Sequence, residues 1–201
     1  MADIILTNIS KSFGDKVLFR EYSLEIERGD FVAIMGASGS GKTTLLNIMG
    51  LLEKPDSGEI TLCGQKKLSF SSPAANKLRR EKISYLFQNY GLIDTETVEG
   101  NMKIATHFKK LGKRDEQQLI ANALAQVGLQ GYEHRKVYTL SGGEQQRVAL
   151  AKIIAKSPQI IFADEPTGNV DPQMSLEIVE LLKRLNETGT TVIMVTHAHD
   201  L

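Results

Sequence analysis

The chain has 201 residues, of which 41% are hydrophobic and 24% are charged, proportions ordinary for a soluble globular protein with a sizeable core. Its 24 basic and 24 acidic residues balance, so the composition favours neither a nucleic-acid groove nor an acidic substrate. The single cysteine, Cys63, excludes an intramolecular disulfide, and a buried or incidental thiol is favoured over a reactive one.

The N-terminus and the apolar runs bear on localisation. The first residues, Met1 to Asn8, lack a basic region followed by a long apolar core, so no signal peptide is expected. No apolar run approaches the roughly 18 residues that a membrane-spanning helix needs. We therefore expect a cytoplasmic chain that reaches a membrane only through its partners.

Short apolar segments separated by glycine-rich turns dominate the N-terminal third. A turn is expected over residues 11–16, with Gly14-Asp15 as its breaker. The polar and basic residues 65–82 predict a solvated surface, with a contact to an anionic surface as the alternative. Strands are expected over 4–9, 22–27, 31–35 and 59–63.

Strand and helix patterns alternate over the rest of the chain. Residues 97–131 are rich in helix formers, with amphipathic stretches at 98–110 and 115–127 and a break at Gly112, so they predict a small inserted helical lobe. This alternation implies an α/β fold with a mainly parallel sheet covered on both faces. The other expected elements are strands over 83–87, 159–163 and 190–195 and helices over 144–156 and 174–187.

The stretch from Gly36 to Thr43 fits G-x-x-x-x-G-K-[ST], a loop that cradles phosphates. A predicted strand precedes it and a predicted helix follows, and the unpaired N–H groups of a helix N-terminus hold anions. Lys42 would reach the β- and γ-phosphates, and the Thr43 hydroxyl would sit on Mg²⁺. A Gly/Ser loop that matches by accident is the alternative, which the context disfavours. The expected nucleotide contacts are Gly36, Ala37, Ser38, Gly39, Ser40, Gly41, Lys42, Thr43 and Thr44.

Two carboxylates follow a later apolar strand. Asp164 stands at a strand end, where a P-loop fold holds Mg²⁺. Glu165 beside it is expected to polarise the attacking water, because hydrolysis needs a proton acceptor in line with the γ-phosphate. Two acids that merely cap a turn are the alternative.

A second anion cradle is predicted at Leu140-Ser141-Gly142-Gly143-Glu144-Gln145-Gln146-Arg147, where a hydroxyl and two glycines begin a helix. Taken alone, Ser-Gly-Gly is equally a turn and a helix cap. Over these eight residues the chain resembles the ATPase subunits of ABC transporters, whose signature begins LSGGQ or LSGGE. The resemblance implies a head-to-tail dimer in which Ser141, Gly142, Gly143 and Glu144 close on the ATP held by the other copy.

The same resemblance assigns further positions. Phe13 matches the aromatic residue that stacks on adenine, usually a tyrosine, although a lone Phe near a turn is also typical of a core. Gln88 matches the glutamine that contacts Mg²⁺ and the attacking water and couples to the membrane partner. Gly168-Asn169-Val170-Asp171 matches the D-loop, which adds Asp171 to the nucleotide site. His197 matches the switch histidine on the γ-phosphate, although Ala198 stands where aspartate usually follows.

The resemblance runs from Phe13 to His197 and implies a complete architecture. The expected fold is a P-loop NTPase core with a mainly parallel sheet, an N-terminal antiparallel β subdomain and an inserted α-helical subdomain. The core would comprise residues 1–88 and 141–201, and the helical subdomain about 89–140. The chain ends just past the switch region, so any further C-terminal element is expected to be absent or trimmed.

The implied activity is ATP hydrolysis with Mg²⁺, coupled through separate membrane permease subunits to export or extraction of a peptide, lipoprotein or drug. Residues 50–58, 87–90 and 164–169 resemble the bacterial subgroup that serves lipoprotein release, macrolide export and antimicrobial-peptide export. An envelope-signalling ATPase with a non-transporting membrane partner, such as a cell-division regulator, is the alternative. A nucleic-acid-associated member is disfavoured, because only 97 residues without sustained heptads separate Thr43 from Ser141.

Tyr90, Leu92 and Ile93 follow Gln88 and are apolar in a segment that is typical of a loop. They are predicted to line a groove for a cytoplasmic helix of the membrane partner, with simple core packing as the alternative.

Overall fold

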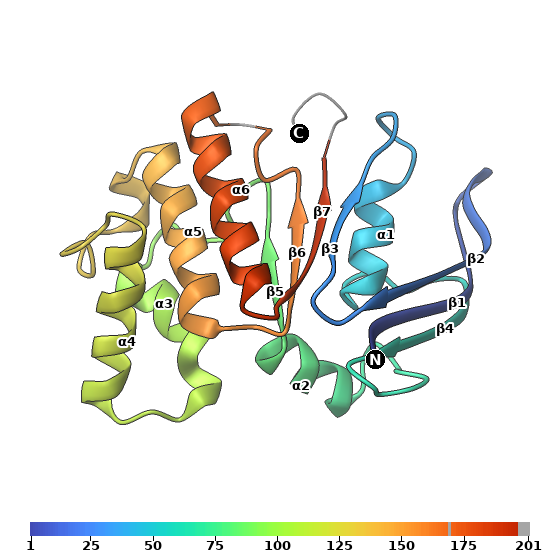
Figure 1. The fold of residues 1–201 in the computed structure, drawn as a ribbon, viewed down its shortest axis with the longest axis horizontal. Coiled ribbons are helices and arrows are strands. Elements are labelled where there is room, and N and C mark those ends of the chain that lie inside the picture. The colour runs from blue at the N-terminus through green and yellow to red at the C-terminus, as the bar shows by residue number, and fades with distance from the viewer. Residues whose placement is uncertain (169, 197–201) are drawn as a thin grey trace.

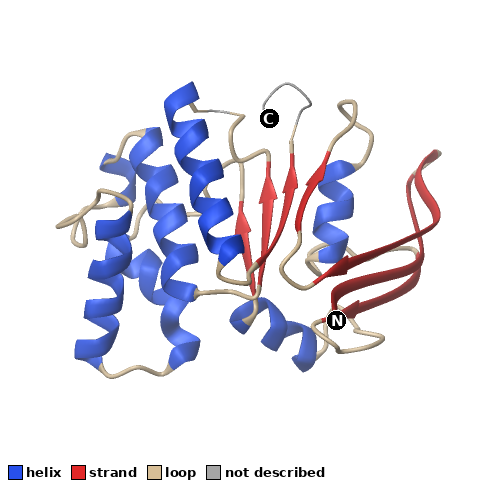
Figure 2. Cartoon of the chain, viewed as in Figure 1, coloured by secondary structure: helices blue, strands red, loops and turns tan. Residues whose placement is uncertain are grey.

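The computed structural model describes residues 1–168 and 170–196. The molecule consists of two sheets and the helices around them. The N-terminal sheet lies at one end of the molecule and the helical lobe at the other (Figures 1 and 2). The fold is the expected mixed α/β architecture, with one parallel and one antiparallel sheet.

The antiparallel sheet has the order β2-β1-β4, with β1 at Ala2–Phe13, β2 at Lys16–Glu27 and β4 at Ser57–Leu62. The turn expected over residues 11–16 is wrong, because only residues 14 and 15 turn while Lys11 to Phe13 pair with β2. Cross-strand pairing therefore extends the hairpin beyond its local turn propensity, and it carries Phe13 and Lys16 out along a long two-stranded arm.

The parallel sheet has the order β3-β7-β6-β5, formed by Phe31–Ile34, Thr191–Val195, Ile160–Asp164 and Ile83–Leu86. Every residue of β7 and all of β6 except Asp164 are buried, as expected for parallel strands covered on both faces. The carboxyl ends of these strands meet at one edge, at the top of Figure 1, where the P-loop and Asp164 lie.

The helices cover this sheet and form the lobe. A helix within residues 65–82 was not expected, yet Ser72 caps one there, Pro73 begins it, and Ala75 and Leu78 are buried. The stretch expected as one helix over 98–110 ends earlier, followed by a 3₁₀ turn at His107–Lys109. The α-helices are α1 at Lys42–Met49, α2 at Pro73–Glu81, α3 at Val98–Thr106, α4 at Lys113–Gln126, α5 at Gly142–Lys156 and α6 at Pro172–Glu187, and a second 3₁₀ turn spans Val137–Thr139.

Helix α5 joins the lobe to the sheet. Its Leu150 and Ile153 pack in the cluster that covers β6 and β7, whereas Val148 and Ala151 pack in the cluster formed with α3 and α4. One rigid helix therefore carries the signature residues at its N-terminus and touches both layers. The division of the chain into core residues and an 89–140 lobe stays a prediction.

The buried carboxylate of Asp3 ties the N-terminal sheet to the parallel sheet. It accepts hydrogen bonds of 2.6 Å from Gln159 Nε2 and 2.6 Å from Thr191 Oγ1. Thr191 Oγ1 in turn accepts the backbone N–H of Gly29 at 2.9 Å. Because a buried carboxylate must be fully hydrogen-bonded, this network fixes where β1 sits against β6 and β7. Within the described residues, no helix is both long and apolar enough to cross a membrane.

Candidate nucleotide site

The P-loop runs from the end of β3 into α1. Gly41 caps α1 in the left-handed region at φ 98°, and a Cβ there would lie 3.0 Å from the Phe19 ring. Any larger residue would be strained and crowded, so the glycine is required by this close approach. The Lys42 ammonium donates to the carbonyl oxygens of Gly36 at 2.9 Å and Ala37 at 3.1 Å. The Lys42 side chain thus lies across the inner side of the loop, and Lys42 is only 8% exposed.

A cavity of about 320 Å³ opens beside this loop, and the P-loop, the hairpin arm and Glu165 line it. Phe13 from β1 and Lys42 from α1 therefore face one space, as the adenine and phosphate assignments require. The lining residues are Phe13, Lys16, Leu18, Ser38, Gly39, Gly41, Lys42, Thr43, Thr44 and Glu165.

Lys16 and Leu18 are lining residues that the sequence did not single out. The Lys16 ammonium donates to the Gly39 carbonyl oxygen at 2.9 Å, which places a second cation on the outside of the P-loop. These two residues were missed because a turn was expected over residues 11–16. Both lie in β2, and the alternation of side chains along that strand places Lys16 and Leu18 on one face.

Phe13 is the last residue of β1. It is 52% exposed, so it is not a core residue. The Lys11 ammonium lies 4.8 Å from the centroid of the Phe13 ring, and the same ammonium pairs with Glu53 at 2.5 Å. A buried, paired cation beside the ring stabilises its position and leaves aromatic surface accessible for stacking.

Asp164 at the end of β6 and Thr43 in the P-loop contact each other. The Thr43 hydroxyl donates to Asp164 Oδ1 at 2.9 Å. Burial raises the pKa of Asp164, and the hydrogen bond from Thr43 partly offsets this rise. No group of three metal-ligating side chains occurs among the described residues. A carboxylate and a hydroxyl nevertheless fit Mg²⁺, which keeps waters and phosphate oxygens as its other ligands.

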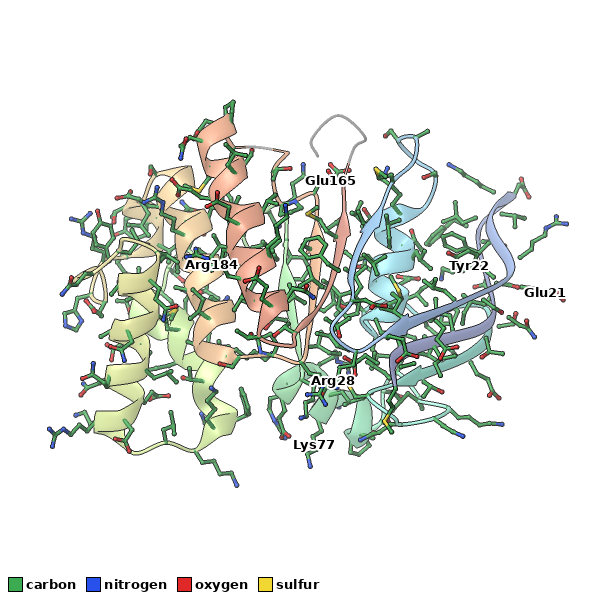
Figure 3. All side chains as sticks on the ribbon, viewed as in Figure 1. Glu21, Tyr22, Arg28, Lys77, Glu165 and Arg184 are labelled. Atoms are coloured by element: carbon green, nitrogen blue, oxygen red, sulfur yellow. The ribbon has the colours of Figure 1, made fainter. Side chains whose placement is uncertain are left out.

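Glu165 stands immediately beyond β6, at the sheet edge (Figure 3). Its backbone has φ 45°, a left-handed conformation that costs energy for a residue with a side chain. Its N–H donates to the Val195 carbonyl at 3.0 Å, and its own carbonyl accepts the Gly168 N–H at 3.1 Å. The neighbouring strand and the following turn thus hold Glu165 in a conformation that presents it to the cavity.

Gln88 lies after β5, on the other side of Asp164. Phe87, Gln88, Asn89 and Tyr90 border a second hollow of about 510 Å³ together with Asp164. A Cβ on Gly168 would lie 3.7 Å from the Gln88 amide nitrogen, so this glutamine also approaches the segment that follows Glu165. The structure therefore brings Gln88 and Asp164 together, whereas Phe13 and Lys42 face the other cavity.

The signature residues cap α5. Ser141 Oγ accepts the Glu144 N–H at 3.3 Å, and Glu144 Oε2 accepts the Ser141 N–H at 2.8 Å, which is a complete capping box. Residues 141–144 do not line the 320 Å³ P-loop cavity as the described residues define it. Helix α5 lies on the far side of β7, β6 and β5 from the P-loop helix α1 (Figure 1). The two predicted anion cradles of one chain therefore lie on opposite sides of its parallel sheet.

Asp171 has a local role. Its carboxylate caps α6 by accepting the Met174 N–H at 3.0 Å. The nucleotide contact expected for Asp171 stays a prediction. Asn169 of the D-loop and the switch histidine His197 lie outside the described residues.

Known proteins share this arrangement. Residues 19–168 match the ABC transporter family. A macrolide export ATP-binding/permease protein of Bdellovibrio bacteriovorus is 43% identical over 100% of this chain, and the chain spans 31% of that relative. An ABC transporter ATP-binding protein of Methanocaldococcus jannaschii is 40% identical over 96% of this chain and 88% of its own length.

Solved structures agree with the sequence comparisons. A dimeric ATP-binding cassette in a post-hydrolysis state, bound to ADP and Pi, is 37% identical and superimposes with a TM-score of 0.88 over 98% of this chain and 89% of its own. The match with the family covers about three quarters of the chain, including the P-loop, Gln88, the signature and both carboxylates. The chain therefore belongs to the ABC transporter family, as an ATPase domain of that family.

Proposed function

We propose that the chain hydrolyses ATP as a head-to-tail dimer and drives export or extraction through separate membrane permease subunits. The observation that carries this proposal is the separation of the two anion cradles in one chain. A phosphate held by the P-loop of one chain does not reach the signature of the same chain. The signature therefore has a phosphate to bind only when a second copy brings its own ATP. The dimeric state of the similar cassette supports such pairing.

Each half-site has a defined task in this scheme. Phe13 stacks on the base, and Lys42 exchanges its two loop carbonyls for phosphate oxygens. Asp164 and Thr43 would hold Mg²⁺, which when bound neutralises charge that develops on the phosphates. Glu165 accepts the proton of the attacking water, and Gln88 orients that water from the Asp164 side. His197 is proposed to contact the γ-phosphate.

The signature completes the site from the partner copy. Because Ser141 Oγ accepts the Glu144 N–H, its own proton is available to donate to a phosphate oxygen. As in any helix, the first backbone N–H groups of α5 point out of its N-terminus, where they can bind the same phosphate. Hydrolysis removes the γ-phosphate that joins the two copies, so the dimer opens and the cycle moves the membrane partner.

The names of relatives support the transport role over an envelope-signalling role. The Bdellovibrio bacteriovorus relative is an ATP-binding/permease protein for macrolide export, and so is a relative from Escherichia coli. The archaeal relative, an ATP-binding protein of comparable length, supports a permease on a separate chain. We place the protein on the cytoplasmic face of a membrane, held there by its permease.

A groove on the chain fits the permease contact. A hollow of about 440 Å³ lies between α2, β5, α3 and α5, with Tyr90 and Phe87 in its lining. Of the three residues predicted to line such a groove, Tyr90 does so, Leu92 packs in the core clusters and Ile93 is 47% exposed outside the hollow. The basic groups Arg80, Lys152 and Lys156 flank the hollow, so the docked helix should carry acidic residues.

Trapping the dimer tests the proposed function. Glu165→Gln removes the proton acceptor while both cradles stay intact, so ATP with Mg²⁺ should convert the chain to a stable dimer in sedimentation or sizing experiments. ADP should leave it monomeric, since the γ-phosphate is missing. A variant that stays monomeric with saturating ATP would refute the two-chain site.

Substitutions in the groove test the permease contact separately. Ile104 is 57% exposed and lines the groove, so Ile104→Glu should abolish stimulation of hydrolysis by the permease while basal hydrolysis persists. Leu176 on α6 is 61% exposed and lies outside the groove, and Leu176→Glu is the matched control. Equal effects of the two substitutions would argue against this docking surface.

A further inference from the structure

The signature carries a negative charge at the place where it is proposed to receive phosphate. Glu144 is in the first turn of α5, beside Ser141 and two glycines. A carboxylate there competes with a phosphate for the same helix N-terminus and repels it. The chain must therefore hold this charge away from the phosphate or neutralise it.

Two hydrogen bonds occupy the Glu144 carboxylate. Its Oε2 accepts the Ser141 N–H at 2.8 Å, and its Oε1 accepts the Tyr132 hydroxyl proton at 2.8 Å. The Arg135 guanidinium lies 3.9 Å from the centroid of the Tyr132 ring, so it stands behind the tyrosine. The hydrogen bonds from Ser141 and Tyr132, with a smaller effect of the Arg135 charge, lower the pKa of Glu144.

The segment before the signature is folded to make this contact. The Tyr132 N–H donates to the Leu129 carbonyl at 3.2 Å, and the Arg135 N–H donates to the Tyr132 carbonyl at 3.0 Å. The Tyr132 ring packs against the lobe cluster that contains Leu129 and Val148. The tyrosine is thus held by the lobe, and it fixes Glu144 in turn.

We propose that Tyr132, backed by Arg135, is a positioning residue that keeps the Glu144 carboxylate on the Ser141 N–H and away from the N–H groups of Gly142 and Gly143, so that the Ser141 hydroxyl and the two glycines can bind the γ-phosphate of ATP on a second copy. The proposal rests on the proposed head-to-tail dimer. It differs from the expected role of Glu144 as a direct nucleotide contact, because both carboxylate oxygens already have donors within their own chain.

The test measures ATP-dependent dimerisation in a Glu165→Gln background, in which ATP is not consumed. Tyr132→Phe keeps the packed ring and removes only the donor to Glu144, and it should weaken the dimer about tenfold, because the effect counts once at each of two sites. Tyr22→Phe is the matched control, since Tyr22 lies on β2 at the opposite end of the molecule (Figure 3). It should change the dimer dissociation constant less than twofold.

Rescue separates positioning from simple loss of structure. Glu144→Gln removes the charge that needs restraint, so it should dimerise at least as tightly as the background. Adding Tyr132→Phe to Glu144→Gln should then have no further effect on the dimer dissociation constant, which is the result expected for coupled residues in a double-mutant cycle. ATP affinity of the single chain, measured below the dimerisation concentration, should stay constant in all variants.

Each outcome decides between the proposals. An equal loss from Tyr132→Phe with and without Glu144→Gln, or no loss at all in a background that dimerises, overturns the positioning role. Weakening by Glu144→Gln alone would show that Glu144 contacts the nucleotide directly, and it also overturns the proposal. A background that never dimerises with ATP refutes the proposed function itself, and the role of Tyr132 with it.

Discussion

Removal of the Lys42 ammonium is the sharpest test of the nucleotide site. Lys42→Met keeps a long apolar stem in a position that is only 8% exposed, so the packing of α1 is preserved. In the ligand-free loop the ammonium donates to the carbonyl oxygens of Gly36 and Ala37. ATP binding exchanges those two bonds for two bonds to phosphate oxygens.

The magnitude follows from this exchange. Two hydrogen bonds between charged groups contribute about 3–6 kcal/mol, and the two bonds lost to the carbonyls offset about 1–3 kcal/mol of that. The net loss of about 2–3 kcal/mol corresponds to a rise in the ATP dissociation constant of roughly 30- to 150-fold.

Calorimetric titration with ATP and Mg²⁺ measures this change directly. Lys183→Met, at an exposed position on α6, is the control and should bind ATP as the parent does. Thermal unfolding of both variants should match the parent without ligand. A Lys42→Met chain whose affinity for ATP stays within threefold of the parent would refute the assignment of this loop to the phosphates.

Three further predictions concern stability. Within the described residues the Tyr85 hydroxyl is buried without a hydrogen-bond partner, so Tyr85→Phe should leave the free energy of unfolding in urea unchanged or raise it by about 1 kcal/mol; a loss above 1 kcal/mol would mean that the hydroxyl is solvated internally. A Cβ on Gly50 would lie 1.3 Å from that hydroxyl oxygen, so Gly50→Ala should cost at least about 2 kcal/mol in the same assay, and a neutral result would contradict the packing of α1 on β5. Burial, followed by repulsion from Lys152, lowers the pKa of Lys156 from 10.5 to about 8. Between pH 8 and pH 10.5 the unfolded chain binds more protons than the folded chain, so stability should rise with pH there by about 3 kcal/mol relative to Lys156→Met, and parallel pH profiles would contradict the shift.

Local patterns in the sequence determined the chemical parts of the site. The loop from Gly36 to Thr43 was identified by its own letters and by the strand and helix around it, because phosphate binding depends on consecutive backbone N–H groups. The acidic pair after β6 was predicted from its place at a strand end, since the carboxyl ends of parallel strands meet at one edge, whereas Gln88 after β5 was assigned by resemblance. Phe13 and the signature were assigned by resemblance; Phe13 lines the P-loop cavity and the signature begins α5, and their contacts with nucleotide stay predictions.

Tertiary contacts decided what local propensity could not. Pairing with β2 made strand of Lys11 to Phe13, where glycine nearby predicted a longer turn, and this pairing brought Lys16 onto the P-loop. Helix α2 was missed because its buried face is only Ala75 and Leu78, too few residues for a periodic signal. The contact between Tyr132 and Glu144 joins residues with no local pattern in common, because it depends on how the lobe packs against α5.

The sequence by itself therefore predicted which groups bind a nucleotide, since each motif is a short run whose spacing sets its backbone geometry. Only the tertiary structure showed that, among the described residues, the signature does not line the P-loop cavity. That separation depends on the order of strands in the sheet and on the packing of α5, which are long-range contacts that no single segment encodes.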